Sequence, residues 1–250
     1  MLCISNSFER NDEYAHAIFR ETRANYSLFT TYYYSRMKGD FHAENIQIGN
    51  GRIIFDLISP IENIPGIELG VPVVINIDNG IGAMALAQIA GATANEIREA
   101  MLSFGGVDRR FDFHIRKDNM VYISDYAHHP EEIKQSILSI KQLYKGRRIK
   151  AIFQPHLYSR TQDFYQEFAD ALSLLDNIVL LDIYPAREEP IPGVTSQLIY
   201  DNLRPGITKQ MIHKEEIIEC VKAKDFDVLV TLGAGDIDNY ATEITNVLNA

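Results

Sequence analysis

Residues 120–130, MVYISDYAHHP, contain the transition that decides the fold of this 250-residue chain. Met120 to Ser124 is a short apolar run typical of a buried strand, and a polar loop follows it. Pro130 and the two glutamates after it favour a helix start, because proline fits the first helical position and acids suit the positive end of the helix dipole. The stretch therefore predicts a strand, a polar loop and a helix in immediate succession.

The same succession repeats toward the end of the chain. Further strands are expected at residues 149–153, 178–184, 210–213 and 227–232, and further helices are expected to begin at Thr161, Thr195 and Lys214 and after Asp236. This alternation predicts a doubly wound, mostly parallel, Rossmann-like α/β domain. We expect it to occupy residues 112–250, with a boundary near residues 111–118. Ligands of such sheets bind beyond the carboxyl ends of the strands.

The first 111 residues have a different texture. A polar helix is expected at residues 8–24, a strand at 30–35 and a small-residue helix at 77–90. Two strands, 44–48 and 52–58, flank Gly49-Asn50-Gly51, and Asn-Gly between apolar-rich runs is typical of a hairpin. Thr93 with Glu96 predicts a capping box for a helix that ends near Phe104.

Composition narrows the class of protein. The formal net charge is −10 and no basic stripe is visible, which argues against a nucleic-acid partner and disfavours anionic membranes. No apolar run reaches membrane-spanning length, and the first residues resemble no secretion signal. Only Cys3 and Cys220 are present, so no disulfide framework is expected. These features favour a cytoplasmic globular protein with small-molecule ligands.

Each strand of the predicted second domain runs into a polar cluster. The clusters are Asp125 to Pro130, Gln154 to Arg160, Tyr184 to Pro190 and Gly233 to Asp236. Because loops that leave one edge of a parallel sheet can converge, we expect these residues to share one crevice.

The histidines of these loops allow a metal reading and a structural reading. His128 and His129 are adjacent, so their side chains diverge, whereas a zinc site needs spaced ligands. In the structural alternative, one histidine caps the Pro130 helix and the other lies on the surface. We expect no metal site in this chain.

Arg160 and Gly233-Ala234-Gly235 each have two readings. Arg160, expected just before a helix at Thr161, can hold a carboxylate bidentately, or it can form a surface ion pair with Asp163 or Glu167. The glycines are a fragment of a phosphate-binding fingerprint or a tight strand-to-helix turn.

Two upstream pairs are also candidates. Asn76 and Asn79, three residues apart on a helix, can present amides to a base or a sugar, or one of them can simply cap the helix. Arg109 and Arg110 lie at the expected boundary and can contact phosphate or form a solvated linker.

Together these motifs resemble the Mur ligase family. The matching segments, in order, are VPVVINIDN, GVDRRFDF, SDYAHHP, FQPHLYSRTQDF, LDIYPAREEPIPGVTS and VTLGAGDID. The resemblance implies that residues 1–111 are the C-terminal part of a central ATP-binding domain and residues 112–250 an amino-acid-binding domain. The implied activity is ATP- and Mg²⁺-dependent joining of L-alanine to UDP-N-acetylmuramate for peptidoglycan synthesis, through an acyl phosphate.

The resemblance also implies roles for individual residues. Asn76 and Asn79 are expected near the adenine, and Arg110 and Asp125 at the nucleotide phosphate and ribose. Tyr126, His128 and His156 are expected around the incoming alanine, and Arg160 at its carboxylate. Arg110 and His128 are the implied catalytic residues.

The chain departs from the family pattern in several places. These 250 residues contain no GxxGKT, the loop whose backbone amides and lysine hold ATP phosphates. Val73, Ile75 and Leu157 stand where relatives often have glycine, histidine and arginine, respectively. Two interpretations stay open: a fragment of an active ligase, and a degenerate binding module that cannot bind ATP.

Overall fold

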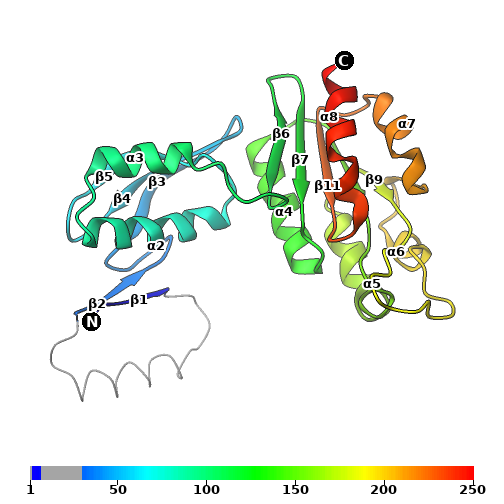
Figure 1. The fold of residues 1–250 in the computed structure, drawn as a ribbon, viewed down its shortest axis with the longest axis horizontal. Helices are drawn as coiled ribbons and strands as arrows, with labels where there is room; N and C mark the ends of the chain where they lie inside the picture. Colours follow the sequence, from blue (N-terminus) through cyan, green and yellow to red (C-terminus); the bar gives the residue numbers. More distant parts are fainter. Residues whose placement is uncertain (1, 7–29) are drawn as a thin grey trace. The chain divides into compact units, whose positions relative to one another are not determined.

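The computed structural model describes the backbone of residues 2–6 and the backbone and side chains of residues 30–250. The chain divides into two compact units, Met1–Gly105 and Gly106–Ala250 (Figure 1). The polar helix predicted at residues 8–24 lies outside the described residues.

The first unit contains both the strand predicted at residues 30–35 and the predicted hairpin. β2 (Thr30–Tyr34) pairs in parallel with β1 (Leu2–Asn6), a strand that the sequence did not indicate. β3 (His42–Gly49) and β4 (Arg52–Ile58) form the predicted antiparallel hairpin, and β5 (Ile64–Glu68) extends it.

The hairpin turn has the geometry that Asn-Gly favours. Asn50 and Gly51 have φ values of 51° and 69°, so both central residues are in the left-handed region. Such a turn has the twist that matches the flanking strands.

Two helices complete the first unit. α2 (Ile75–Ile89) begins two residues before its predicted start, and α3 (Ala94–Ser103) follows Thr93. The predicted capping box is present, because the Thr93 side chain accepts the Glu96 N–H and Glu96 accepts the Thr93 N–H at 2.8 Å.

The second unit is built on a six-stranded sheet. Its order is β10-β9-β8-β11-β7-β6, and all pairings are parallel except that of β6 with β7. The strands are β6 (Asp112–Arg116), β7 (Val121–Asp125), β8 (Ile149–Phe153), β9 (Asn177–Leu180), β10 (Thr208–Met211) and β11 (Val228–Leu232). The predicted mostly parallel sheet is confirmed; its antiparallel edge strand β6 was not predicted.

Helices cover both faces of this sheet. They are α4 (Pro130–Leu143), α5 (Tyr158–Leu172), α6 (Gln197–Asn202), η1 (Lys214–Glu216), α7 (Ile217–Lys222), η2 (Asp236–Tyr240) and α8 (Ala241–Asn249). The sheet residues Ile152 and Leu229 share a core cluster with Ile244 of α8. Phe153, the neighbour of Ile152, contacts Phe168 of α5 at 5.4 Å between ring centroids. Since adjacent strand residues point to opposite faces, α5 and α8 lie on opposite sides, and the doubly wound prediction is confirmed.

The units divide earlier than the boundary predicted near residues 111–118. Residues 106–111 belong to the second unit. Phe111 is buried there, and the Tyr126 N–H donates to the Arg109 carbonyl at 2.6 Å. These contacts attach the segment to the sheet, so the solvated-linker alternative for Arg109 and Arg110 does not describe it.

Several element ends also differ from prediction. α5 begins at Tyr158 rather than Thr161, because the Thr161 N–H and hydroxyl both donate to the Leu157 carbonyl and close a helical turn before it. β9 ends at Leu180 rather than residue 184, although an isolated parallel bridge continues at Tyr184. The other boundaries differ from the predicted ones by at most three residues, which is usual at fraying ends.

Candidate functional site

The carboxyl ends of the parallel strands are level at one edge of the sheet. Leu232 of β11 pairs with Asp125 of β7 and with Phe153 of β8, and Phe153 pairs with Leu180 of β9. The polar loops that follow these strands therefore leave the sheet side by side. This is the edge at which open α/β sheets bind ligands.

Aromatic side chains connect three of these loops. The Tyr126 and His128 rings lie 5.1 Å apart, and the His128 and His156 rings lie 6.0 Å apart. His156 in turn stacks on Tyr184 at 5.7 Å. The predicted convergence of Tyr126, His128 and His156 is thus present; we call these three residues and Arg160 the ring cluster.

Arg160 lies in the first turn of α5, and its guanidinium faces the His156 ring. Its Nη1 atom is 3.4 Å from His156 Nδ1. Within residues 30–250, neither Asp163 nor Glu167 forms an ion pair with it. The geometry thus agrees with the ligand-facing reading of Arg160 rather than with the surface pair.

Hydrogen bonding sets the tautomers of the two histidines. An arginine can only donate, so His156 Nδ1 accepts from Arg160 and the neutral ring carries its proton on Nε2. His128 Nδ1 lies 2.9 Å from the Tyr126 carbonyl, which can only accept, so this nitrogen is protonated. In a neutral ring, the lone pair of His128 is therefore on Nε2.

Burial keeps His156 uncharged. Loss of solvent lowers its pKa below the ordinary 6.5, and the positive charge of Arg160 and the nearby His128 lower it further. Near neutral pH the ring cluster therefore combines one fixed cation with an uncharged imidazole, an arrangement suited to a carboxylate with an adjacent polar group.

Glu188 is a member of the site that the sequence reasoning missed as an individual residue. Its carboxylate accepts the backbone N–H of Ser159 at 2.9 Å and the Ser159 hydroxyl at 2.5 Å. These bonds satisfy the amino end of α5 and lower the pKa of Glu188. Only a tertiary contact across 29 residues identifies this role.

The neighbouring arginines at the start of the second unit, Arg109 and Arg110, differ in their exposure and their contacts. Arg110, the predicted phosphate ligand, is exposed. Arg109 instead lies over the Tyr126 ring at 4.8 Å, and its Nε atom is 3.1 Å from Asp238. Arg109 therefore supports Tyr126, a role that its position beside Arg110 did not indicate.

Asp125 lies at the end of β7 and is largely buried. Burial raises the pKa of its carboxyl, while the Ala127 N–H, which donates at 3.3 Å, acts in the opposite direction. A perturbed carboxyl at the ligand edge of a sheet is a functional-site candidate.

The glycines after β11 are explained by close packing. A Cβ on Gly235 would lie 2.3 Å from Gln154 Oε1 and 2.7 Å from Tyr184 Cβ. Gly233 has φ +140°, and a Cβ there would lie 2.6 Å from the Gln154 carbonyl oxygen. The tight-turn reading therefore accounts for both glycines without a phosphate.

His129 is separated from the ring cluster, as its adjacency to His128 predicts. It is the N-cap residue of α4, its N–H donates to Glu132 at 3.2 Å, and its ring lies against Phe164 at 5.2 Å. Across the described residues, no group of three His, Cys, Asp or Glu side chains could hold a metal ion.

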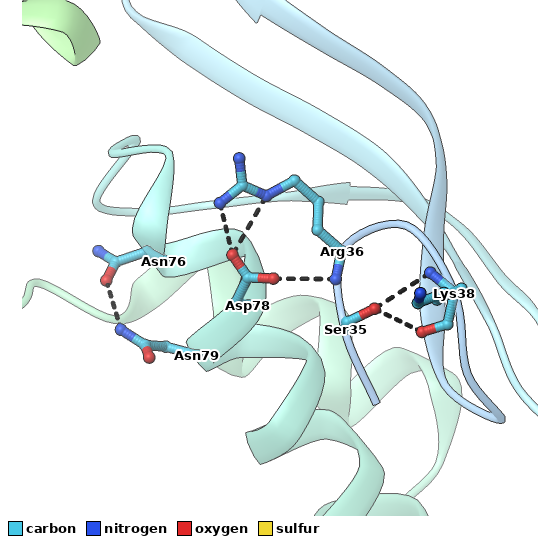
Figure 2. A network of polar contacts seen from close by, with 6 residues as sticks. All are labelled: Ser35, Arg36, Lys38, Asn76, Asp78 and Asn79. Atoms are coloured by element: carbon cyan, nitrogen blue, oxygen red, sulfur yellow. Dashed lines mark hydrogen bonds and ion pairs between the residues drawn. The ribbon is translucent and has the colours of Figure 1, made fainter. Parts of the chain in front are cut away.

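Asn76 and Asn79 form a separate candidate site in the first turn of α2. Asn79 Nδ2 donates to Asn76 Oδ1 at 3.2 Å (Figure 2). Asn76 Nδ2 donates to the Val71 carbonyl at 3.2 Å. The two amides share a face, as predicted. The capping alternative is wrong, because the N-cap residue is Val74.

Leu157 marks backbone strain beside the ring cluster. Its φ and ψ are 73° and 136°, a conformation that a branched residue rarely adopts. Its N–H donates to the Tyr184 carbonyl at 2.9 Å, and its carbonyl caps the first turn of α5. The surrounding hydrogen bonds hold the strained residue in place, as is common where a site must be positioned.

The fold is an α/β domain whose polar loops converge at the carboxyl edge of a mostly parallel sheet. Residues 109–235 match the family model described as Mur ligase, glutamate ligase domain, and the chain belongs to this family. In the part of the chain that the structure describes, every helix is too short or too polar to span a lipid bilayer.

Individual relatives agree with this assignment. The chain is 65% identical over 218 residues to a UDP-N-acetylmuramate–L-alanine ligase of Phocaeicola vulgatus. The aligned residues make up 87% of this chain and 48% of that protein. The chain is 46% identical over 223 residues to the ligase of the same name from Porphyromonas gingivalis, covering 89% of this chain and 48% of that protein. The chain thus spans about half the length of the curated relatives it matches.

A solved structure has a similar fold. The UDP-N-acetylmuramate–alanine ligase of Thermotoga maritima superposes with a TM-score of 0.73 at 22% identity, covering 99% of this chain and 59% of that one. At this identity the similarity supports the fold only.

Proposed function

We propose that this chain is part of an ATP-dependent ligase that joins L-alanine to UDP-N-acetylmuramate in peptidoglycan synthesis. The observation that carries the proposal is the 65% identity to a ligase of that name over 87% of the chain. The ring cluster supports it independently, because it places a fixed cation beside aromatic rings at the carboxyl edge of the sheet. No observation favours the degenerate binding module.

In this proposal the ring cluster binds the amino acid. Arg160 anchors the carboxylate of alanine through paired, charge-assisted hydrogen bonds. Tyr126 and His156 border the substrate, and the neutral state of His156 avoids a second strongly solvated charge next to the guanidinium. Glu188 holds the first turn of α5, and with it the direction of Arg160.

His128 is the proposed proton acceptor. An amino acid carries an ammonium group at neutral pH, and its nitrogen must lose a proton before it can attack an acyl group. Because Nδ1 of His128 is directed at the Tyr126 carbonyl, Nε2 is the atom available for this proton. The developing negative charge at the reacting acyl group needs fixed cations, and we propose Arg110 for part of this role.

Other residues are proposed for the nucleotide. The amides of Asn76 and Asn79 suit an adenine edge, since an amide can accept from the amino group and donate to a ring nitrogen. Arg110 is proposed at the phosphates and Asp125 at the ribose. When bound, ATP supplies the phosphoryl group that activates the muramyl carboxylate.

The proposed cofactors are ATP and Mg²⁺, and we propose a cytoplasmic location and no nucleic-acid or membrane partner. The described residues offer no cluster of three metal ligands, so we assign no side chain of this chain to Mg²⁺ and no step to it. The net charge of −10 is consistent with the absence of a nucleic-acid footprint.

The test is a fusion that joins the part of the P. vulgatus ligase not covered by this chain to residues 1–250; we call it the fused ligase. With UDP-N-acetylmuramate, ATP and radiolabelled L-alanine it should form the alanyl product, whereas the 250-residue chain alone should form none, because it lacks GxxGKT. The intact P. vulgatus enzyme is the positive control. A well-folded but inactive fused ligase would support the degenerate module, and a preference for L-serine or glycine would correct the substrate.

A further inference from the structure

We infer that Arg36 and Asp78 form a positioning pair that sets the direction of the Asn76 and Asn79 amides and thereby the selectivity for adenine. The inference rests on the proposed function, in which these two amides contact the nucleotide base. Asp78 lies in the VPVVINIDN segment, residues 71–79, but neither it nor Arg36 was among the candidate site residues expected from the sequence.

The pair joins the first turn of α2 to the loop after β2. Asp78 Oδ1 accepts the Arg36 backbone N–H at 2.9 Å. Asp78 Oδ2 accepts Arg36 Nε at 3.1 Å and Nη2 at 2.5 Å. Figure 2 shows Asp78 directed toward Arg36, while Asn76 and Asn79 project from the other side of the same turn.

Burial makes this contact strong and directional. The Asp78 residue is only 5% exposed, so an unpaired carboxylate there would be costly. All three hydrogen bonds come from one residue and include its backbone N–H, so they fix both the side chain and the main chain of Arg36. The planar guanidinium adds an angular constraint that a lysine cannot supply.

The loop on the other side of the pair is itself restrained. The Ser35 hydroxyl donates to the Lys38 carbonyl at 2.5 Å and accepts the Lys38 N–H at 3.1 Å. Asp40 accepts the Tyr33 N–H at 2.7 Å, which closes the loop at its base. Arg36 therefore offers α2 a rigid anchor.

The amides depend on the direction of this helical turn. Asn79 is exposed, and its side chain is held by its bond to Asn76. Asn76 is held by the Val71 carbonyl, just before the helix. A rotation of the turn would break the bond from Asn76 to Val71 and, because Asn76 and Asn79 belong to the same turn, would redirect both amides together. Asp78, between the two asparagines in sequence, opposes that rotation.

The experiment measures ATP and GTP dissociation constants of the fused ligase and its variants, together with the Michaelis constant for alanine. Asp78→Asn keeps the shape and an acceptor for the Arg36 N–H but removes the charge. It should weaken ATP binding about tenfold and GTP binding little, so that the ATP/GTP selectivity falls. Arg36→Lys should lose part of that selectivity, and the alanine constant should not change.

A matched control is Arg52→Gln, which breaks an exposed Arg52–Glu68 pair in the same unit. It should leave nucleotide selectivity unchanged. If Asp78 only stabilised the fold, Asp78→Asn would lower the fraction of active protein while both dissociation constants of the folded protein stayed the same. That result would overturn the inference.

Asn79→Ala separates this inference from the proposed function. If Asn79→Ala lowers the ATP/GTP selectivity and Asp78→Asn does not, the positioning role is wrong and the adenine contact stands. If Asn79→Ala has no effect, or the parent protein does not discriminate ATP from GTP, the adenine contact fails and the positioning pair fails with it.

Discussion

The ring cluster and the first turn of α2 present their functional groups in different ways. Tyr126 follows β7, whereas His156 and Arg160 follow β8, and they meet because β7 and β8 both pair in parallel with β11 and end level with it. Asn76 and Asn79 come from one helical turn, and a spacing of three residues is enough to put them on one face. A site built from several strands depends on the whole sheet, whereas a site on one turn depends on local geometry and one anchor.

Arg160 is expected to give the largest effect. Arg160→Ala in the fused ligase should raise the alanine Michaelis constant about ten- to a hundredfold, since charge-assisted hydrogen bonds contribute roughly 1.5–3 kcal/mol. Arg160→Lys should recover part of this loss. The control is Arg148→Ala, which removes an exposed arginine just before the amino end of β8. An unchanged alanine constant in Arg160→Ala would show that the carboxylate is held elsewhere.

Gly235 tests whether the ring cluster depends on the packing of the sheet edge. Gly235→Ala should destabilise the chain by about 1–3 kcal/mol, because its Cβ would overlap Gln154 and Tyr184. Chemical unfolding of the 250-residue chain measures the change. Gly105→Ala is the control, since a Cβ there meets nothing within 4 Å and should be nearly neutral. Equal stability of the two variants would contradict the packing account.

The titration of His156 tests whether the positive charge of Arg160 acts on the His156 ring within the ring cluster. Burial is the first cause of its low pKa and Arg160 the second, so Arg160→Ala should move the pKa upward but leave it below 6.5. Because the folded pKa is depressed, the unfolded chain takes up this proton first as pH falls below about 6.5, and stability declines from there downward. Arg160→Ala should reduce that decline.

The measurement for His156 is the chemical shift of its ring proton as a function of pH in the 250-residue chain. His213, whose pKa is raised by Asp182, is an internal control and should titrate alike in both proteins. A His156 curve that does not move in Arg160→Ala would mean that the guanidinium does not face the ring.

Asp125 is expected to give the smallest effect. Its pKa is raised by burial, so stability is lost as pH rises through the interval above the ordinary value of 3.8, and the ionised carboxylate destabilises the fold at neutral pH. Asp125→Asn should therefore stabilise the chain at pH 7 by about 0.5 kcal/mol while weakening nucleotide binding by the fused ligase. Asp118→Asn, in an exposed turn, should change neither property. A destabilised Asp125→Asn protein would show that the charge is needed for folding.

Much of the fold follows from local sequence patterns. Asn50-Gly51 predicts the hairpin, Thr93 with Glu96 predicts the capping box, and Pro130 marks the first residue of α4. These features depend on residues close in sequence, whose preferences act over one turn. The edge strand β6 escaped prediction because its identity as a strand depends on pairing with β7.

The residues of the candidate site could be predicted from the sequence, but most of their contacts could not. Tyr126, His128, His156 and Arg160 lie in polar clusters that follow two predicted strands, and the family resemblance implied their individual roles. The contacts of Arg109, Gln154 and Glu188 could not be predicted, because their partners lie far away in the chain: Asp238 for Arg109, Ile237 for Gln154 and Ser159 for Glu188.

Local sequence patterns predict the strand–helix alternation of the second unit, its mostly parallel class and the residue types at the strand ends, because periodicity and turn chemistry act over a few residues. Three contacts could be learned from the folded molecule alone: Arg160 faces His156 rather than Asp163, Gly235 packs against Gln154, and Asp78 holds Arg36. Each of these depends on the distance between atoms that the chain brings together only when the sheet and the helices pack.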